Sequence, residues 1–454
     1  MPKTDLPKDV QDFLATFPKT ESVDAFVLDL AGTALGKRYP VAEIGKLCSG
    51  GFAFPEAVFT LDVTGDCCDP QGIGFSDGDP DGLGKMVPGS LAPVPWADEP
   101  TAQCLIDLRR VDGAPIWYDP RVVLRKVVDC LHADGWQPVT AVELEFFLID
   151  PLRDDAGAPQ PPKSPTTGRP STVRKVYGME KLEDFSAVLR AIDRACAAQN
   201  IPTSVVSSEF APGQFELNLH HVDDPVTAAD HACLLRRCVR AVARQHGFDA
   251  TFLPKPYIDM TGSGLHAHVS VLNEAGGNIF DDANDPDETV IRQAIAGMQA
   301  TMAEAMAFFS PGINGFRRFE ANYCVPVTTD WGYDNRSVAF RIPAARGAAK
   351  RIEHRVAGAD ANPHLVLACV LAGLHHGLKN RLAVSSDPHP GNAGYKMARD
   401  IPFKIWDALD RLADAPVLGS YLGQDYLTLY RDIKQAEFNA LLDAPLRREF
   451  DWYL

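Results

Sequence analysis

The sequence predicts an α+β fold, in which a small β-rich unit ends near residue 112 and a larger unit follows it. Two observations lead to this prediction. Segments whose apolar residues alternate with a period of two are interleaved with segments of helical periodicity, and no internal repeat is found. The 454 residues, 46% of them hydrophobic and 23% charged, are also enough for one large core or two domains.

The N-terminal unit is expected to contain strands at residues 23–30 and 101–108, which are rich in apolar and β-branched residues. Loops rich in Gly, Pro and Asp, such as residues 77–83, separate these strands. A helix at residues 121–134 then opens the larger unit, because Pro120 is favourable at a helix start and the apolar residues recur at helical spacing.

The larger unit is expected to hold several more helices and one long loop. Residues 151–170 are dense in Pro, Asp, Gly and Ser, which predicts a mobile loop. Apolar periodicity predicts further helices at residues 182–199, 226–245, 287–309 and 363–382, and a mainly helical tail at residues 403–453.

The composition and the N-terminal sequence limit which classes of binding partner and which cellular compartment are expected for the protein. A formal net charge of −16 argues against nucleic acid or an anionic membrane as the main partner, since both need a basic surface. The N-terminus lacks the apolar core of a signal peptide and no window reaches the length of a membrane span, so a cytoplasmic location is expected. The ten cysteines show no CxxC spacing and are expected to be reduced, mostly as small core residues.

Carboxylates recur on two of the predicted strands. Glu143 and Glu145 lie two residues apart within residues 141–149 (AVELEFFLI), so their side chains point to the same side of a strand. The flanking residues are too apolar for a freely solvated face, and buried paired carboxylates need cations. Glu209 and Glu216 bracket a Pro-Gly turn further along the chain.

Histidines share one face of the strand predicted within residues 261–271 (TGSGLHAHVSV), where His266, His268 and Ser270 alternate with apolar residues. One histidine in such a strand is usually structural. Two of them beside glycines that allow close ligand approach fit a metal or nucleotide site equally well. Histidines without such support are interpreted as structural: His364, His375 and His376.

Arginines dominate two later strands. Arg351, Glu353 and Arg355 share a face in residues 351–356, and Arg341 lies in the strand predicted at residues 336–342. Each such pattern alone is more often a solvated strand face. Together, the carboxylates and histidine suit Mg²⁺ or Mn²⁺, and the arginines suit phosphate, as in-line phosphoryl transfer requires. The sequence contains no GxxxxGK[ST] motif, so it is not a P-loop protein.

Several separated motifs resemble those of the glutamine synthetase superfamily and follow the family's order: ELEFFL, EFAPGQFELNL, GSGLHAHVS, NRSVAFRIP, RIEHR and ANPHL. The resemblance spans nearly the whole chain. It implies a β-grasp-like domain at residues 1–112, and a catalytic domain at residues 113–454 with a curved antiparallel half-barrel sheet surrounded by helices.

The same resemblance implies roles for individual residues. One metal ion would be bound by Glu145, Glu209 and Glu216, and the other by Glu143, His266 and Glu353. Binding of the substrate glutamate is implied for Arg318, Arg355 and Gly262. ATP binding is implied for His268, Ser270, Arg336, Arg341 and Arg351. The residues expected to be catalytic are Arg336, Glu353, Arg318 and Cys324.

The reaction implied by the resemblance has two steps. ATP, with two or three Mg²⁺ or Mn²⁺ ions per site, phosphorylates the γ-carboxylate of glutamate, and an amine then displaces phosphate from the acyl phosphate. Phosphorylation is needed because a carboxylate is a poor electrophile, and water must be kept from the intermediate. The resemblance further implies a homo-oligomer, a dodecamer of two hexameric rings.

The chain departs from glutamine synthetase where that enzyme binds ammonium. Cys324 stands where the family has a glutamate, residues 54–56 stand near the position of a family aspartate, and Thr261 replaces an asparagine. Loss of acidic groups weakens capture of a small cation. The hypothesis is therefore an organic amine as acceptor, as in γ-glutamylpolyamine synthetases. The far ammonium group of a diamine would need partners, for which the candidates are Asp330, Trp331, Tyr333 and Asp334.

Two alternatives stay open at this point. A true glutamine synthetase using ammonia has the same chemistry and is disfavoured by Cys324. A catalytically inactive homologue acting as sensor or scaffold belongs to another class, and the intact set of acidic, histidine and arginine residues argues against it.

Overall fold

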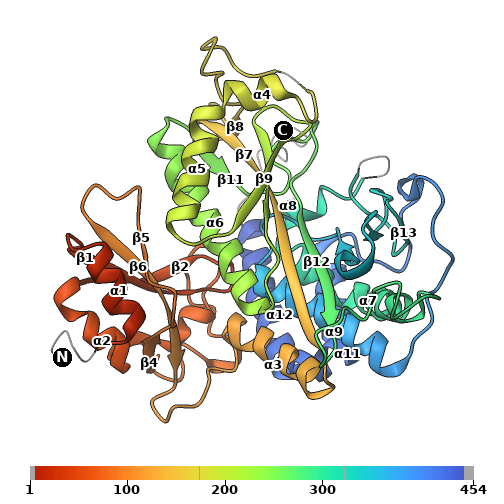
Figure 1. Ribbon diagram of the computed structural model, residues 1–454, viewed down its shortest axis with the longest axis horizontal. Coiled ribbons are helices and arrows are strands. Elements are labelled where there is room, and N and C mark those ends of the chain that lie inside the picture. Colours follow the sequence, from red (N-terminus) through yellow and green to blue (C-terminus); the bar gives the residue numbers. More distant parts are fainter. Residues whose placement is uncertain (1–5, 173, 321–323, 444–454) are drawn as a thin grey trace.

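The chain folds around two β-sheets, a smaller one from residues 22–109 and a larger one from residues 137–354 (Figure 1). The computed structural model describes residues 6–172, 174–320 and 324–443. The elements of the N-terminal part are α1 (Lys8–Thr16), β1 (Ser22–Leu28), β2 (Ala34–Pro40), α2 (Ile44–Ser49), β3 (Phe52–Pro55), β4 (Asp81–Met86), β5 (Ala92–Pro93) and β6 (Thr101–Arg109).

The smaller sheet has the strand order β2-β1-β6-β4-β3, with β5 paired to β6. Its two central strands, β1 and β6, run parallel, and the other pairs are antiparallel. These central strands are the two that the sequence predicts, and β6 is buried almost without alternation, as a covered parallel strand is. The β-grasp-like expectation is confirmed.

The larger sheet and its helices form the rest of the described chain. Its strands are β7 (Gln137–Arg153), β8 (Pro159–Gln160), β9 (Thr203–Ser208), β10 (Gln214–Leu219), β11 (Asp249–Thr251), β12 (Leu265–Leu272), β13 (Trp331–Tyr333), β14 (Phe340–Ile342) and β15 (Ile352–His354). The helices are α3 (Pro120–Ala133), α4 (Met179–Asp184), α5 (Ser186–Ala198), α6 (Pro225–Gln245), α7 (Thr289–Phe309), α8 (Ile313–Phe316), α9 (Pro363–Asn380), α10 (Ile405–Ala413), α11 (Pro416–Leu422) and α12 (Gln424–Asp443).

Strand β7 is the spine of the larger sheet, whose order is β13-β14-β15-β12-β7-β10-β9, with β8 and β11 also on β7. Figure 1 shows β7 and β12 running side by side through the centre of this part. All neighbours along the path are antiparallel, as the expected antiparallel sheet requires, except β13 and β14, which are parallel. Helices α3, α6 and α9 pack against the sheet.

The long periodic helices lie close to their predicted positions, whereas several short predictions shift. The helix expected at residues 182–199 is interrupted at Phe185, and the strand expected at residues 336–342 forms only as β14. The loop expected at residues 151–170 contains β8, which pairs back onto β7. The helical tail is confirmed up to Asp443, and the residues after it lie outside the described part of the chain.

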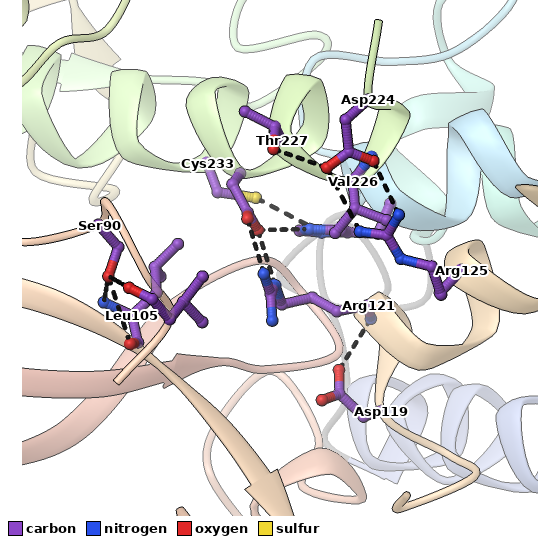
Figure 2. Close-up of polar contacts among 12 residues, drawn as sticks. Ser90, Leu105, Asp119, Arg121, Arg125, Asp224, Val226, Thr227 and Cys233 are labelled. Atoms are coloured by element: carbon purple, nitrogen blue, oxygen red, sulfur yellow. Dashed lines mark hydrogen bonds and ion pairs between the residues drawn. The ribbon is translucent and has the colours of Figure 1, made fainter. Parts of the chain in front are cut away.

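A buried ionic network joins α3, α6 and α9. Arg121 donates from Nε and Nη2 to the two carboxylate oxygens of Asp230, at 2.9 Å each, and His364 Nε2 lies 2.9 Å from the same carboxylate. Figure 2 shows Arg121 and Arg125 extending from α3 toward α6. Cys233 Sγ lies 4.0 Å from His364 Nδ1, but burial raises the pKa of this thiol to about 12, so it is no nucleophile. The structural interpretation of His364 is confirmed.

The structure also agrees with the expectations for His375 and for the cysteines. His375 is buried and lies 2.6 Å from the Tyr421 hydroxyl, as a structural histidine does. The ten cysteines all fall within the described residues and all carry free thiols, most of them buried. Among the described helices, none is both long and apolar enough to cross a bilayer.

Candidate active site

The register of the larger sheet brings the predicted charged residues together. Strands β10, β7, β12, β15 and β14 are successive neighbours, and residues paired across neighbouring strands have Cβ atoms about 4.5–5.5 Å apart. The charged cross-strand pairs, in order across the sheet, are Glu216 with Glu145, Glu143 with His266, His268 with Glu353, and Glu353 with Arg341. One face of the sheet therefore carries a continuous band of acids, histidines and arginines.

Glu143 is the centre of this band. Its Oε2 lies 3.1 Å from His266 Nδ1, and its Oε1 lies 2.8 Å from His268 Nε2. Burial opposes ionisation of Glu143, but the hydrogen bonds from the two histidines outweigh it and hold its pKa below the usual range. Arg351 Nε donates to His268 Nδ1 at 3.2 Å, so the proton of a neutral His268 lies on Nε2, the nitrogen nearest to Glu143.

Three further carboxylates crowd around Glu143. Burial raises the pKa of Glu145 to about 8, and the charge of Glu209 adds to the shift. Burial raises the pKa of Glu216 to about 9, with the neighbouring carboxylates contributing, and also raises the pKa of Glu209. Each of these groups makes ionisation of the others more costly. Divalent cations bound among them would relieve that repulsion.

Glu353 has a different environment, because arginines surround it. Its Oε2 accepts from Arg341 Nη1 at 2.7 Å, and its Oε1 accepts from Arg355 Nη1. Although the side chain is only 1% exposed and burial opposes ionisation, the charge of Arg355 lowers the pKa of Glu353 to about 2. Oε1 also lies 3.7 Å from His266 Nδ1. Glu353 is thus an anion held between the metal-type ligands and the guanidinium groups.

Within the described part of the chain, two sets of three side chains have the spacing of a metal site, and both include Glu143. One set adds His268 and Glu353, and the other adds Glu216 and His266. The predicted ligands therefore converge, as proximity of Glu145 and Glu209 to this cluster also indicates. His268, which the sequence places at the nucleotide, lies among the ligands as well. The assignment of particular ligands to particular ions stays a prediction.

Binding of Mg²⁺ or Mn²⁺ is expected to release protons, because ligating carboxylates must be ionised. Glu145 and Glu216, with pKa values of about 8 and about 9, carry protons in the metal-free protein at neutral pH. The affinity for metal should therefore rise as the pH rises from about 6 to about 9. Titration calorimetry in buffers of different ionisation enthalpy measures the protons released, and Glu216→Gln should release fewer. Release of none by the unsubstituted protein would contradict the expectation.

A cleft of about 660 Å³ opens over this band of side chains. Its walls include all five residues predicted to bind ATP, namely His268, Ser270, Arg336, Arg341 and Arg351. Residues that the sequence did not single out also line it: Tyr177, Ser207, Asn218, His220 and His221. Only Asn218 carried a usable signal, because it lies two residues after Glu216 and so shares its face of β10. The others come from turns and strand ends, where no periodicity marks them.

Arg318 is not among the residues that line the cleft and is only 2% exposed. Its guanidinium donates to three backbone carbonyls, those of Ser263, Val356 and Ala357, at 3.2, 2.5 and 2.9 Å. A Cβ at Gly262 would lie 2.8 Å from Arg318 Cγ, so only glycine fits this close approach. Arg318 therefore braces the loops that carry Gly262 and Arg355, and its direct contact with glutamate stays a prediction.

The candidates for binding a distant ammonium group are engaged within the chain. Trp331 is fully buried, and the Tyr333 hydroxyl is hydrogen bonded to Glu288. Asp334 forms an ion pair with Arg341 at 2.5 Å, and Asp330 accepts a hydrogen bond from a threonine of its own loop. The interpretation of residues 330–334 as a structural segment is therefore better supported than a role in binding the ammonium group.

None of the three positions predicted to depart from glutamine synthetase presents a free carboxylate. Cys324 is exposed, with its thiol free, and residues 321–323 before it lie outside the described part. Glu56 is buried in the N-terminal part, where it accepts from the Tyr118 hydroxyl at 3.2 Å and lies 3.4 Å from Arg110 Nε. Thr261 donates to Gln214 Oε1 at 2.8 Å and so supports the loop at Gly262.

Comparisons with known proteins agree with this geometry. Residues 117–453 match the family model described as glutamine synthetase, catalytic domain. The chain is 38% identical over 447 residues to γ-glutamylputrescine synthetase PuuA of Escherichia coli (strain K12), covering 98% of this chain and 94% of the relative. It is 29% identical over 410 residues to glutamate–isopropylamine ligase of a Pseudomonas species, covering 89% and 87%.

A solved structure shows the same fold. The GmaS–ADP complex superposes with a TM-score of 0.82 and 24% sequence identity, covering 97% of this chain and 98% of the other. The family match covers most of the chain and includes every strand of the acidic and basic band. The chain belongs to the glutamine synthetase family of ATP-dependent carbon–nitrogen ligases.

Proposed function

We propose that the protein uses ATP to join the γ-carboxylate of glutamate to an organic amine, giving a γ-glutamylamide, ADP and phosphate. The observation that carries the proposal is the band of Glu143, His266, Glu353 and Arg341 across the sheet. Cys324, at the position where the resemblance predicts the ammonium-binding glutamate, offers no carboxylate. The relatives described above act, by their names, on putrescine and isopropylamine.

The residues of the cleft have separate tasks in this reaction. The clustered carboxylates and histidines would hold Mg²⁺ or Mn²⁺, which neutralise the ATP phosphates and orient the γ-phosphoryl group. Arg336 and Arg341 line the cleft and stabilise charge on the moving phosphoryl group. Arg355 is held by Glu353 and binds the glutamate substrate. The γ-carboxylate oxygen attacks phosphorus and ADP leaves; the amine then attacks the acyl carbon, and phosphate leaves with that oxygen.

An organic amine is expected to be a better acceptor than ammonia. Ammonium capture needs an opposite charge close by, and the exposed Cys324 supplies none. Phosphate release should be measured with ATP and glutamate and, in turn, ammonia, methylamine, ethanolamine, isopropylamine or putrescine. We expect kcat/KM for at least one organic amine to exceed that for ammonia by about tenfold or more, equivalent to about 1.4 kcal/mol.

The substitution Cys324→Glu tests the cause of this preference. It should raise kcat/KM for ammonia relative to the best organic amine, since a carboxylate returns to the position, whereas Cys324→Ser should leave the ratio unchanged. A wild-type protein that prefers ammonia would favour ordinary glutamine synthetase. Phosphate release with none of the amines would favour the inactive homologue.

Assembly belongs to the same proposal. By resemblance to the family, we expect double-ring dodecamers with active sites between adjacent subunits, each cleft completed by a neighbour's N-terminal domain. The cleft lining described here comes from residues 139–353 of one chain, which leaves room for such a contribution.

A further inference from the structure

Lys181, the third residue of α4, is a buried lysine that the reaction outlined above does not use. Only 6% of the residue is exposed, and its Nζ donates to the backbone oxygens of Glu209 at 2.7 Å and Ala211 at 2.5 Å. The same ammonium group lies 5.5 Å from the centre of the Phe215 ring. Lys181 therefore ties α4 to the turn that carries the predicted metal ligand Glu209 and to the start of β10.

The segment before Lys181 is attached to the same turn. Tyr177, which lines the catalytic cleft, donates its backbone N–H to the Ser208 carbonyl at 2.8 Å, and the Ser208 hydroxyl donates to the Gly178 carbonyl at 3.2 Å. Four hydrogen bonds thus join residues 177–181 to residues 208–211. The two hydrogen bonds made by Lys181 reach the backbone oxygens of Glu209 and of Ala211, two residues further along.

Burial of the Lys181 ammonium group is energetically unfavourable, which indicates that Lys181 has a functional role. A buried ammonium group is costly unless it is compensated, and no carboxylate oxygen of the described residues lies within 4.0 Å of Lys181 Nζ. Its acceptors are two carbonyls, one of them on the fully buried Ala211. If the ammonium were removed, the Glu209 carbonyl would lose this partner and the Ala211 carbonyl would keep only the backbone N–H of Gln214, at 3.1 Å, so the turn would rearrange.

We propose that Lys181 is a positioning residue for metal binding, because it fixes the turn that presents Glu209 to the cluster of Glu143, Glu145 and Glu216. The inference rests on the proposed function only in taking this cluster as a metal site. Loss of the positive charge would by itself favour a cation, whereas loss of the two hydrogen bonds displaces a ligand. Partners of metal ligands change affinity by about 10–100-fold when they are removed, so the second effect is expected to be larger.

Binding of Mn²⁺ to the full-length protein, without ATP, glutamate or amine, tests the inference by calorimetry or electron paramagnetic resonance. Lys181→Met keeps much of the side-chain volume but has no donor, and it should weaken Mn²⁺ binding at least about tenfold. Lys181→Gln has no charge but retains an N–H donor, so it should lose less affinity than Lys181→Met. Lys434→Met is the matched control, because Lys434 is equally buried but pairs with Glu437 on α12.

The outcomes separate the inference from the proposed function. Unchanged or tighter Mn²⁺ binding by Lys181→Met would overturn the inference even if the protein ligates amines. Equal losses in the Met and Gln variants would show that the remaining N–H donor makes no difference and would overturn the hydrogen-bonded clamp. A comparable loss in Lys434→Met would mark a general effect of burying methionine and would overturn it too. Failure of every amine as substrate, with the Met and Gln losses as expected, would leave the inference standing and remove only the proposed reaction.

Discussion

Glu353→Gln is expected to lower glutamate-dependent phosphate release at least about a thousandfold, equivalent to about 4 kcal/mol of transition-state stabilisation. The substitution removes a predicted metal ligand and the anion between Arg341 and Arg355. The guanidinium groups would then repel each other, and neither would remain where the phosphoryl group and glutamate need it. Both the metal ions and the substrates are thus affected by one change.

Phosphate release should be followed with ATP, saturating Mg²⁺, glutamate and the best amine of the panel. Glu99→Gln removes the same charge from an exposed position in the N-terminal part of the chain, and it should retain full activity. Circular dichroism should show that Glu353→Gln remains folded. Activity within about tenfold of the unsubstituted protein would refute the placement of Glu353 at the reacting phosphate.

Arg121→Met is expected to destabilise the protein by about 3–5 kcal/mol, because it leaves a buried carboxylate without its main partner. Arg121 and Asp230 are 14% and 8% exposed at their side chains and form a bidentate pair. Burial opposes ionisation of Asp230, but the charge of Arg121 outweighs it and holds the pKa of Asp230 below its usual range. Urea unfolding followed by circular dichroism measures the loss.

Arg125→Met provides a matched control one helical turn further along α3. Arg125 also pairs with an aspartate of the region where α6 begins, but the side chains are 45% and 35% exposed (Figure 2). An exposed pair contributes below about 1 kcal/mol, so this variant should unfold close to the unsubstituted protein. Equal effects of the two substitutions would show that burial does not distinguish the pairs.

The pair of Arg121 and Asp230 also has a predicted pH dependence. A carboxyl group whose folded-state pKa is lowered stabilises the fold fully above its unfolded pKa of about 3.9, and the contribution disappears as the pH falls toward the folded value. The difference in stability between Arg121→Met and the unsubstituted protein should therefore be constant near neutral pH and shrink below about pH 4.

Much of the candidate site could be predicted because period-two alternation is a local property of a strand. Glu143 and Glu145 do share a face of β7, and His266 and His268 share a face of β12. The resemblance of the motifs to those of the family then indicated that these strands belong to one catalytic site. Boundaries were less predictable, because the turn at residues 209–213 depends on hydrogen bonds to α4 and β10 that no local pattern contains.

The sequence by itself determined which residues share a strand face and the acidic and basic character of successive strands, and it predicted the replacement at Cys324. Only the tertiary structure decided that Glu216 lies beside Glu145 and that Glu353 lies between two arginines. It also decided that Trp331 is buried and that Lys181 holds the Glu209 turn. The physical reason is that strand register and burial arise from contacts between residues far apart in the chain, whereas periodicity reports only on neighbours.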